Sequence, residues 1–270
     1  MSTSTPATAG SAAAEVPPPL VPEEGDDDAF GAFGPTISSL FQSGHPKWGF
    51  LVYRVYYGDE ESWQRFMGIL NRVSDNWIRR SHKERLLPYL FWTTMEDREA
   101  FEGASKDAIR DSFRSWVDAR SVERDGPGAD SPNIAEWSPR YRACLYVDKE
   151  VLESATLTEY PSAVNPTGFY LKVDGRVVLI DSQYGEHFLN HPGVDEYDWQ
   201  EIEDGDLAEE DLDEDEYDPI EGKTSFDVGW QYVGLGVAAA IYDIMCENYD
   251  AWIRPSFYKR PPAVWDGKFR

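Results

Sequence analysis

The sequence predicts an α+β protein with a mixed, mostly antiparallel sheet and helices packed on one face. In the first half of the chain, apolar strand segments alternate with segments of helical spacing, in the order β-α-β-α-β. In the second half, strand segments follow one another through short turns, which is typical of antiparallel pairing. We therefore expect a ferredoxin-like unit with additions.

The first predicted strand, at 48–57, is mainly apolar on both of its alternating faces, which indicates a central strand covered on both sides. Gly58 ends this strand, and Asp59 is the expected cap of a helix with apolar residues at helical spacing. The helix is predicted to end near Arg80. The arginines and lysine at 79–85 suit the negative end of a helix dipole.

The following elements are predicted from the same signals. We expect a strand at 87–97, a helix at 103–119 that begins at Ser105, a strand at 141–148, and a short helix that Asp148 begins.

The segment 168–184 contains two β-rich runs joined by Asp174 and Gly175, a pair typical of hairpin turns. A short strand at 227–233 and a buried helix at 235–252 follow. A proline-rich tail is expected to lie on the surface.

The chain is predicted to have a disordered N-terminal segment at 1–40 and a single α+β domain at 41–270. The first segment is rich in serine, threonine, alanine and proline and has no apolar period. An acidic disordered insertion is expected at about 194–222, because no lysine or arginine occurs between Arg176 and Lys223.

The formal net charge of −25 disfavours binding to nucleic acid and to anionic membranes, since both require clustered basic residues. A small molecule or a basic protein surface is the expected partner. Cys144 and Cys246 lie in apolar stretches and are predicted to be buried thiols. A cytoplasmic location is expected because the N-terminus lacks the charged start and apolar core of a secretion signal.

Arg54 is the first candidate site residue, because a permanent charge is unusual in an apolar strand. It could bind a carboxylate or phosphate with two parallel hydrogen bonds. Alternatively it forms a buried ion pair with Asp97, Asp148 or Asp181, all at predicted strand ends.

A pocket lined by aromatic side chains is the second candidate site, and ordinary core packing is its alternative. It would lie on a sheet face that helices leave open, with Tyr53, Tyr56, Trp92, Trp230 and Tyr232 around it. The ligand-binding candidates are therefore Arg54, Tyr53, Tyr56, Trp92, Asp181 and Trp230.

No metal and no cofactor are predicted. His187 and His191 would face one metal on a helix, with Asp181 or Glu186 completing the site, but histidines of a surface loop are the simpler interpretation. The acidic run 211–222 lacks the glycine and the final glutamate of a calcium-binding loop. The short motifs of P-loop proteins, serine hydrolases and zinc proteases are absent from the sequence.

Several separated motifs together resemble a family of uncharacterised intracellular proteins of filamentous fungi. They are WGFLVYRVYYG, ASKD, the VD-ending strand YRACLYVD, and EGKTSFDVGW with a late RPP. The resemblance covers most of residues 47–265 and implies a fungal intracellular protein. It implies no activity, cofactor or catalytic residue. Gln231 stands where the family pattern leads us to expect methionine.

We therefore expect a non-catalytic protein that binds a partner or a small ligand. The resemblance adds a link to secondary metabolism, because some relatives are accessory members of such gene clusters. The alternative is a cofactor-free enzyme acting on an apolar metabolite, with Arg54, a tyrosine and an aspartate as its polar groups.

Overall fold

The computed structural model describes residues 17, 20–21, 33–161, 169–184, 217–247 and 257–267. Within these ranges the elements are α1 (Gly34–Ser43), β1 (Leu51–Arg54), α2 (Glu60–Arg80), the 3-10 helix η1 (Glu84–Tyr89), β2 (Thr93–Met95), α3 (Arg98–Phe101), α4 (Lys106–Asp118), α5 (Val122–Asp125), α6 (Ile134–Trp137), η2 (Pro139–Tyr141), β3 (Ala143–Val147), α7 (Lys149–Ser154), β4 (Thr156–Pro161), β5 (Phe169–Asp174), β6 (Arg176–Asp181), β7 (Trp230–Gly234), η5 (Leu235–Val237), α8 (Ala238–Glu247) and β8 (Val264–Trp265).

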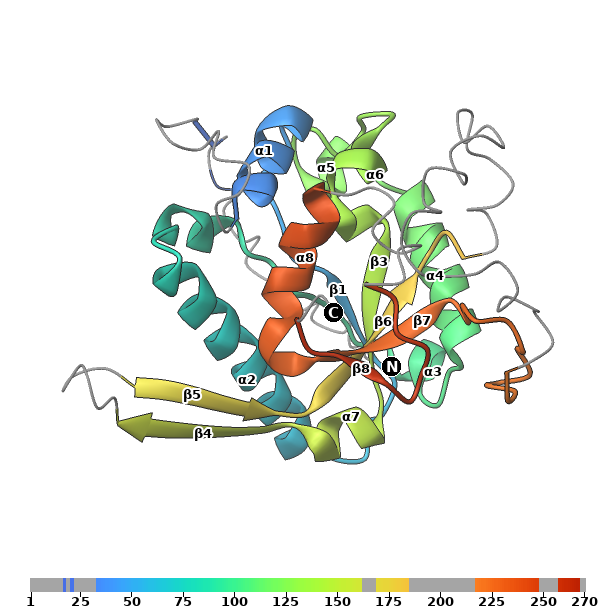
Figure 1. Cartoon of the computed structure of the whole chain (residues 1–270). Coiled ribbons are helices and arrows are strands. Elements are labelled where there is room, and N and C mark those ends of the chain that lie inside the picture. The colour runs from blue at the N-terminus through green and yellow to red at the C-terminus, as the bar shows by residue number, and fades with distance from the viewer. Residues whose placement is uncertain are drawn as a thin grey trace, which may run out of the picture.

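The strands form a six-stranded sheet in the order β2-β1-β3-β6-β7-β8 and a separate two-stranded sheet, β4-β5 (Figure 1). The pairs β1–β2, β1–β3 and β7–β8 are parallel, whereas β3–β6, β6–β7 and β4–β5 are antiparallel. The predicted α+β class with a mixed sheet is confirmed. The ferredoxin-like unit is not found, because that unit joins its second and third strands by a hairpin, and here α3 and α4 separate β2 from β3.

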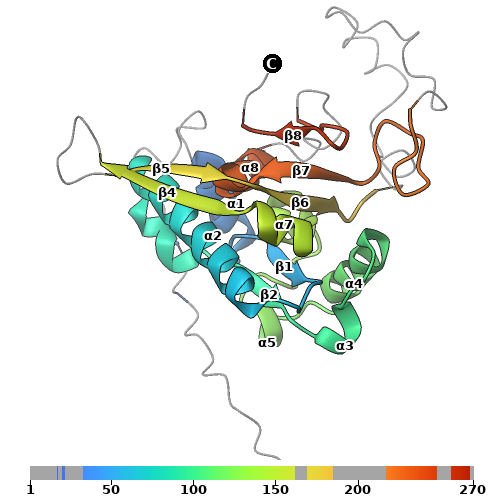
Figure 2. The same ribbon diagram turned by 90° about the horizontal axis from the view of Figure 1, so that it is seen from below.

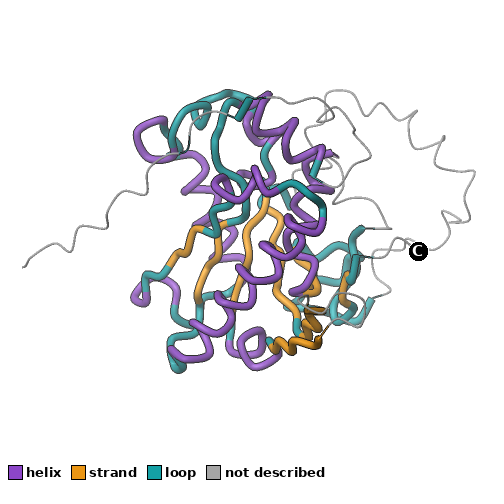
Figure 3. Tube along the Cα trace, turned by 90° about the vertical axis from the view of Figure 1, so that its left-hand side faces the viewer, coloured by secondary structure: helices purple, strands orange, loops and turns teal. Residues whose placement is uncertain are grey.

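Helices cover both faces of the large sheet, so the prediction of helices on one face is wrong. On one face, the ring of Phe50 lies 5.0 Å from that of Tyr242 in α8. On the other, the ring of Tyr53 lies 5.2 Å from Phe101 in α3 and 6.5 Å from Phe113 in α4. Figure 1 shows α2 and α8 on one side of the strands and α4 on the other, and Figure 3 shows helices crossing in front of the strands. The reason is visible in β1 itself, which is buried on both sides.

The predicted boundary between a disordered segment at 1–40 and the folded domain lies too late in the chain. Phe33 is buried, and α1 begins at Gly34 and packs beside α8. The Asp243 carboxylate of α8 accepts hydrogen bonds from the backbone N–H groups of Phe33 (2.8 Å) and Thr36 (2.9 Å). This carboxylate from a distant part of the chain satisfies donors at the start of α1, a role that local patterning does not reveal.

Three predicted helix starts are confirmed by side-chain caps. The oxygens of Asp59, Ser105 and Asp148 accept hydrogen bonds from the backbone N–H groups of Ser62, Ala108 and Val151. The helix α2 also ends at Arg80, as predicted. The strand predicted at 87–97 is only partly correct, because η1 occupies its first residues and includes Pro88, leaving β2 as a short strand.

The strands β4 and β5 form an arm that extends from the body of the molecule (Figure 2). Asp174 and Gly175 do not make the predicted hairpin turn there, since β5 pairs with β4 while β6 pairs with β3 and β7. Gly175 has φ of +113°, and a Cβ at this position would lie 2.7 Å from the carbonyl oxygen of Ser154. Glycine therefore lets the chain pass from the arm into the large sheet in a crowded, left-handed conformation.

Most of the predicted acidic insertion at 194–222 lies outside the described residues, as do His187 and His191. Among the residues that are described, no three histidine, cysteine, aspartate or glutamate side chains gather as metal ligands. A search of the same residues finds no helix with the length and apolar character needed to cross a membrane.

Candidate functional site

Arg54 is enclosed by partners from its own neighbourhood. Its side chain is buried at the end of β1, and the residue is 3% exposed. One guanidinium nitrogen, Nη1, lies 2.7 Å from Glu60 and 3.3 Å from Glu96. The Nε–H group donates to the backbone carbonyl of Tyr56 at 3.1 Å. The positive charge of Arg54 is thus balanced by the carboxylates of Glu60 and Glu96, whose side chains are partly exposed to solvent.

The interpretation of Arg54 as half of an ion pair is supported, but the predicted partners are wrong. Asp97 and Asp148 use their carboxylates to cap the helices that follow them, and a carboxylate oxygen of Asp181 accepts from the backbone N–H of Gln183. Aspartates at strand ends serve the adjacent backbone, and the longer glutamate side chains reach the guanidinium instead.

Two aromatic rings complete the enclosure of Arg54. Its guanidinium carbon lies 4.6 Å from the ring centroid of Tyr57 and 5.1 Å from that of Trp63. Cation–π contacts of this kind stabilise a partly desolvated charge. The Arg54 site is therefore closed, and its geometry gives the guanidinium the role of joining β1 to the start of α2.

The predicted aromatic residues do not surround one pocket. Tyr53 faces α3 and α4, on the opposite side of the sheet from Arg54, and burial raises the pKa of its hydroxyl. Trp92 lies near Phe50, on the face that α8 covers. None of the six ligand-binding candidates lines either of the two cavities described below, within the part of the chain that the structure describes.

Trp230 belongs to a cluster of motif residues that are far apart in the sequence. Lys106 of the ASKD motif places its Nζ atom 4.1 Å from the ring centroid of Trp230 and 5.3 Å from that of Tyr146. The same Nζ lies 2.5 Å from the carboxylate of Glu221, in the EG part of the later motif. The Lys106 side chain is only slightly exposed, and its ammonium group contacts the Glu221 carboxylate and both aromatic rings.

The next residue of the motif extends this cluster. The Asp107 carboxylate accepts hydrogen bonds from Lys223, at 2.8 Å, and from Arg110. Burial opposes ionisation of Asp107, but these two hydrogen bonds hold its pKa below the usual range. Arg110 also donates to the carbonyls of Asp181 at 2.8 Å and Gly229 at 2.7 Å. We interpret the cluster as a junction that ties the start of β7 to α4.

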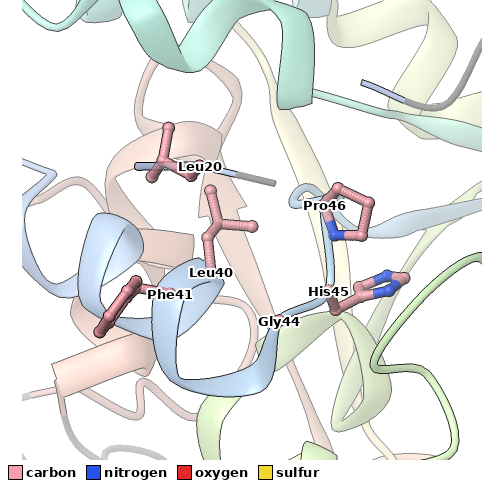
Figure 4. A pocket seen from close by; sticks show the side chains of 6 residues that line it. All are labelled: Leu20, Leu40, Phe41, Gly44, His45 and Pro46. Atoms are coloured by element: carbon pink, nitrogen blue, oxygen red, sulfur yellow. The ribbon is translucent and has the colours of Figure 1, made fainter. Parts of the chain in front are cut away.

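A small pocket lies beside α1 (Figure 4). Its volume is about 130 Å³, close to the roughly 150 Å³ of an engineered cavity that holds benzene. The lining residues are Leu20, Leu40, Phe41, Gly44, His45 and Pro46. Such a volume suits a small apolar group.

His45, beside this pocket, is the buried titratable group that sequence reasoning missed. Its Nδ1 lies 3.2 Å from the carbonyl oxygen of Pro127, and its Nε2 lies 3.3 Å from the hydroxyl of Tyr141. Burial, helped by the charge of Arg140, lowers the pKa of His45 from 6.5 to about 4. The imidazole is therefore neutral at neutral pH, and no pattern in the sequence around it signals this burial.

A larger groove of about 470 Å³ runs between the end of α2, the inner face of the arm, and η5. We call it the arm groove. Its lining residues are Val73, Asn76, Trp77, Arg80, Ser81, Leu171, Val173, Gly236 and Val237. Trp77 spans it by donating its indole N–H to the carbonyl oxygen of Gly236 at 2.9 Å, and remains 37% exposed.

Arg80 distinguishes the arm groove from the Arg54 site. The neighbouring Arg79 is paired with Asp75 at 2.9 Å, and Arg72 is paired with Glu159 of the arm at 3.3 Å. In the described part of the chain Arg80 has no ion pair and no side-chain hydrogen bond, and it is exposed. The arm groove thus combines apolar walls with an available cation.

Comparisons with protein-family models, with curated proteins and with solved structures found no match to this chain.

Proposed function

We propose that this is a non-catalytic interaction protein that binds a peptide segment of its partner in the arm groove. The observation that carries the proposal is an open groove with apolar walls, a partly exposed tryptophan and an arginine that has no ion pair among the described residues. Binding sites are typically apolar clefts with a few polar groups that fix orientation, and tryptophan and arginine are frequent energetic anchors.

The use of the buried arginines supports this choice over catalysis. Arg140 donates to the backbone carbonyls of Gly49 and Phe91, and Arg110 donates to those of Asp181 and Gly229. With Arg54 held by two glutamates, these cations stabilise the fold by satisfying buried acceptors. Arg54, the arginine expected for an enzyme of the alternative type, is thus committed to internal contacts.

Two further proposals follow from the sequence. The acidic segment 196–222 is proposed to contact a basic protein surface. If the chain keeps the same partners after deletion of residues 196–218, the segment does not contribute to partner binding. The resemblance to fungal intracellular proteins supports a role accessory to secondary metabolism.

A peptide-display selection on the immobilised full chain tests the proposed function. Asn76 lines the arm groove, whereas Asn71 lies on the same helix, is exposed and does not line it. We expect selected peptides to keep their affinity for Asn71→Trp and to lose at least about tenfold for Asn76→Trp, which places a bulky side chain in the groove.

Two results would count against the proposal. One is that no peptide is enriched over a blank surface. The other is that the enriched peptides bind Asn76→Trp and Asn71→Trp equally well, which would locate their site elsewhere. Circular dichroism of both variants checks that they keep the fold.

A further inference from the structure

The strand β5 presents a backbone edge beside the arm groove. Its six residues pair with β4 in a register that runs from Thr156 with Asp174 to Pro161 with Phe169. Among the described strands β5 has no second partner. At its end, the backbone N–H of Leu235 in η5 donates to the carbonyl of Gly175, just beyond β5. Unpaired edge strands are templates for the addition of another strand.

The side chains of β5 that line the groove alternate. Leu171 and Val173 line it, and Lys172 between them points to the other face and pairs with Asp174 at 2.9 Å. A strand added to β5 would also place every second side chain toward the groove. Those side chains would meet apolar walls from Val73 and Trp77 of α2.

The charge near the groove is opposite to that of the chain as a whole. Residues 71–85 contain five arginines and lysines and two acidic residues, in a chain with a net charge of −25. Of the arginines at 72, 79 and 80, the first two have carboxylate partners and Arg80 has none in the part that the structure describes. An exposed cation at a binding groove favours a partner with a carboxylate at the matching position.

The edge of β5 has no second strand partner in the described structure, the groove lining alternates, and Arg80 supplies a positive charge. From these observations we infer that the partner segment is extended and acidic and adds to β5 as a third strand. Its backbone pairs with β5, alternate side chains enter the arm groove, and a carboxylate contacts Arg80. This inference rests on the proposed function, because it names the kind of peptide that the groove takes.

The test uses three labelled, capped peptides of eight residues with serine at every second position. The four positions between the serines face the groove, and they hold three valines followed by aspartate, lysine or serine. Fluorescence anisotropy measures their affinity for the full chain. We expect saturable binding of the aspartate peptide and weaker binding of the other two. Arg80→Glu should weaken it by at least about tenfold, and Arg79→Glu, which makes the same change of charge outside the groove, by less than about threefold.

A fourth peptide separates strand addition from simple charge attraction. It has the aspartate sequence with alternate backbone amides methylated along the edge that pairs, which removes hydrogen-bond donors and keeps the charge. Loss of its binding supports strand addition, whereas equal affinity of the methylated and unmethylated peptides would overturn it. Equal weakening by Arg80→Glu and Arg79→Glu would overturn the assigned carboxylate contact.

The display selection distinguishes failure of this inference from failure of the proposed function. If selected peptides bind the arm groove but are basic or helical, the strand inference is wrong and the interaction function stands. If no peptide is sensitive to Asn76→Trp, both are wrong.

Discussion

The two ends of α2 use an arginine in opposite ways. Before the helix, Arg54 is buried, and it contacts Glu60, the first helical residue, at 2.7 Å. At the other end Arg80, the last helical residue, is exposed and without a partner in the described structure. The arginine inside the strand therefore forms an internal ion pair. The arginine at the helix end, whose position the helix dipole already explains, lines the open groove instead.

The largest expected effect on stability concerns the enclosed His45. Because the unfolded chain binds a proton at pH about 6.5 while His45 stays neutral down to about pH 4, stability should fall as pH decreases through this window. The loss is about 3 kcal/mol, because the pKa values of the unfolded and folded chains differ by about 2.5. Urea denaturation of the natural chain and of His45→Gln at several pH values gives the free energy of unfolding of each. The loss is the change with pH in the difference between these two free energies. A difference that stays constant from pH 7 to pH 4 would contradict the burial of a neutral imidazole.

The next effect tests the closed end of α2. Arg54→Met should lower the free energy of unfolding by about 2 kcal/mol, because it removes hydrogen bonds and ring contacts while filling the space of the side-chain stem. Glu60 is 63% exposed in its side chain, so water can replace the lost cation and the cost stays moderate. Denaturant midpoints measure this change, and affinity for the aspartate peptide should be unaltered.

A smaller effect is expected at Trp77, which lines the groove and also links α2 to η5 by a hydrogen bond. Trp77→Phe removes the N–H that binds the carbonyl of Gly236 and should cost about 1 kcal/mol of stability. Peptide affinity should fall as well, since part of the aromatic wall is lost. A variant with unchanged stability would show that this hydrogen bond does not hold the groove together.

The smallest effect on stability belongs to Arg80. Arg80→Gln should change the free energy of unfolding by less than about 0.5 kcal/mol, because the Arg80 side chain is exposed and has no partner among the described residues. Its effect should appear in peptide binding instead. If Arg80→Gln destabilises the protein as much as Arg54→Met, the contrast between the two ends of α2 is wrong.

Local chemistry made much of the fold predictable from the sequence. The caps at Asp59, Ser105 and Asp148 and the end of α2 at Arg80 follow from interactions within a few residues of each position. The turn expected at Gly175 failed because the dipeptide signal reports a need for positive φ but not which strands pair.

The candidate site was less predictable because it depends on contacts between distant parts of the chain. The arm groove joins α2 to residues about 100 and 160 positions later. Arg80 differs from Arg72 and Arg79 only in having no carboxylate partner within the part of the chain that the structure describes. For Arg54 the sequence indicated the charge and its burial. It did not indicate which carboxylates would pair with Arg54, because the predicted partners Asp97 and Asp148 cap the helices that follow them instead.

Hydrogen exchange of the full chain, with and without the aspartate peptide, tests the central claim most directly. Strand addition to β5 predicts slower exchange of backbone amides at 169–174, with little change at the pocket residues 40–46 and at β1. Unchanged exchange in β5 under saturating peptide, or protection confined to another region, would contradict the claim that the arm groove is the binding site.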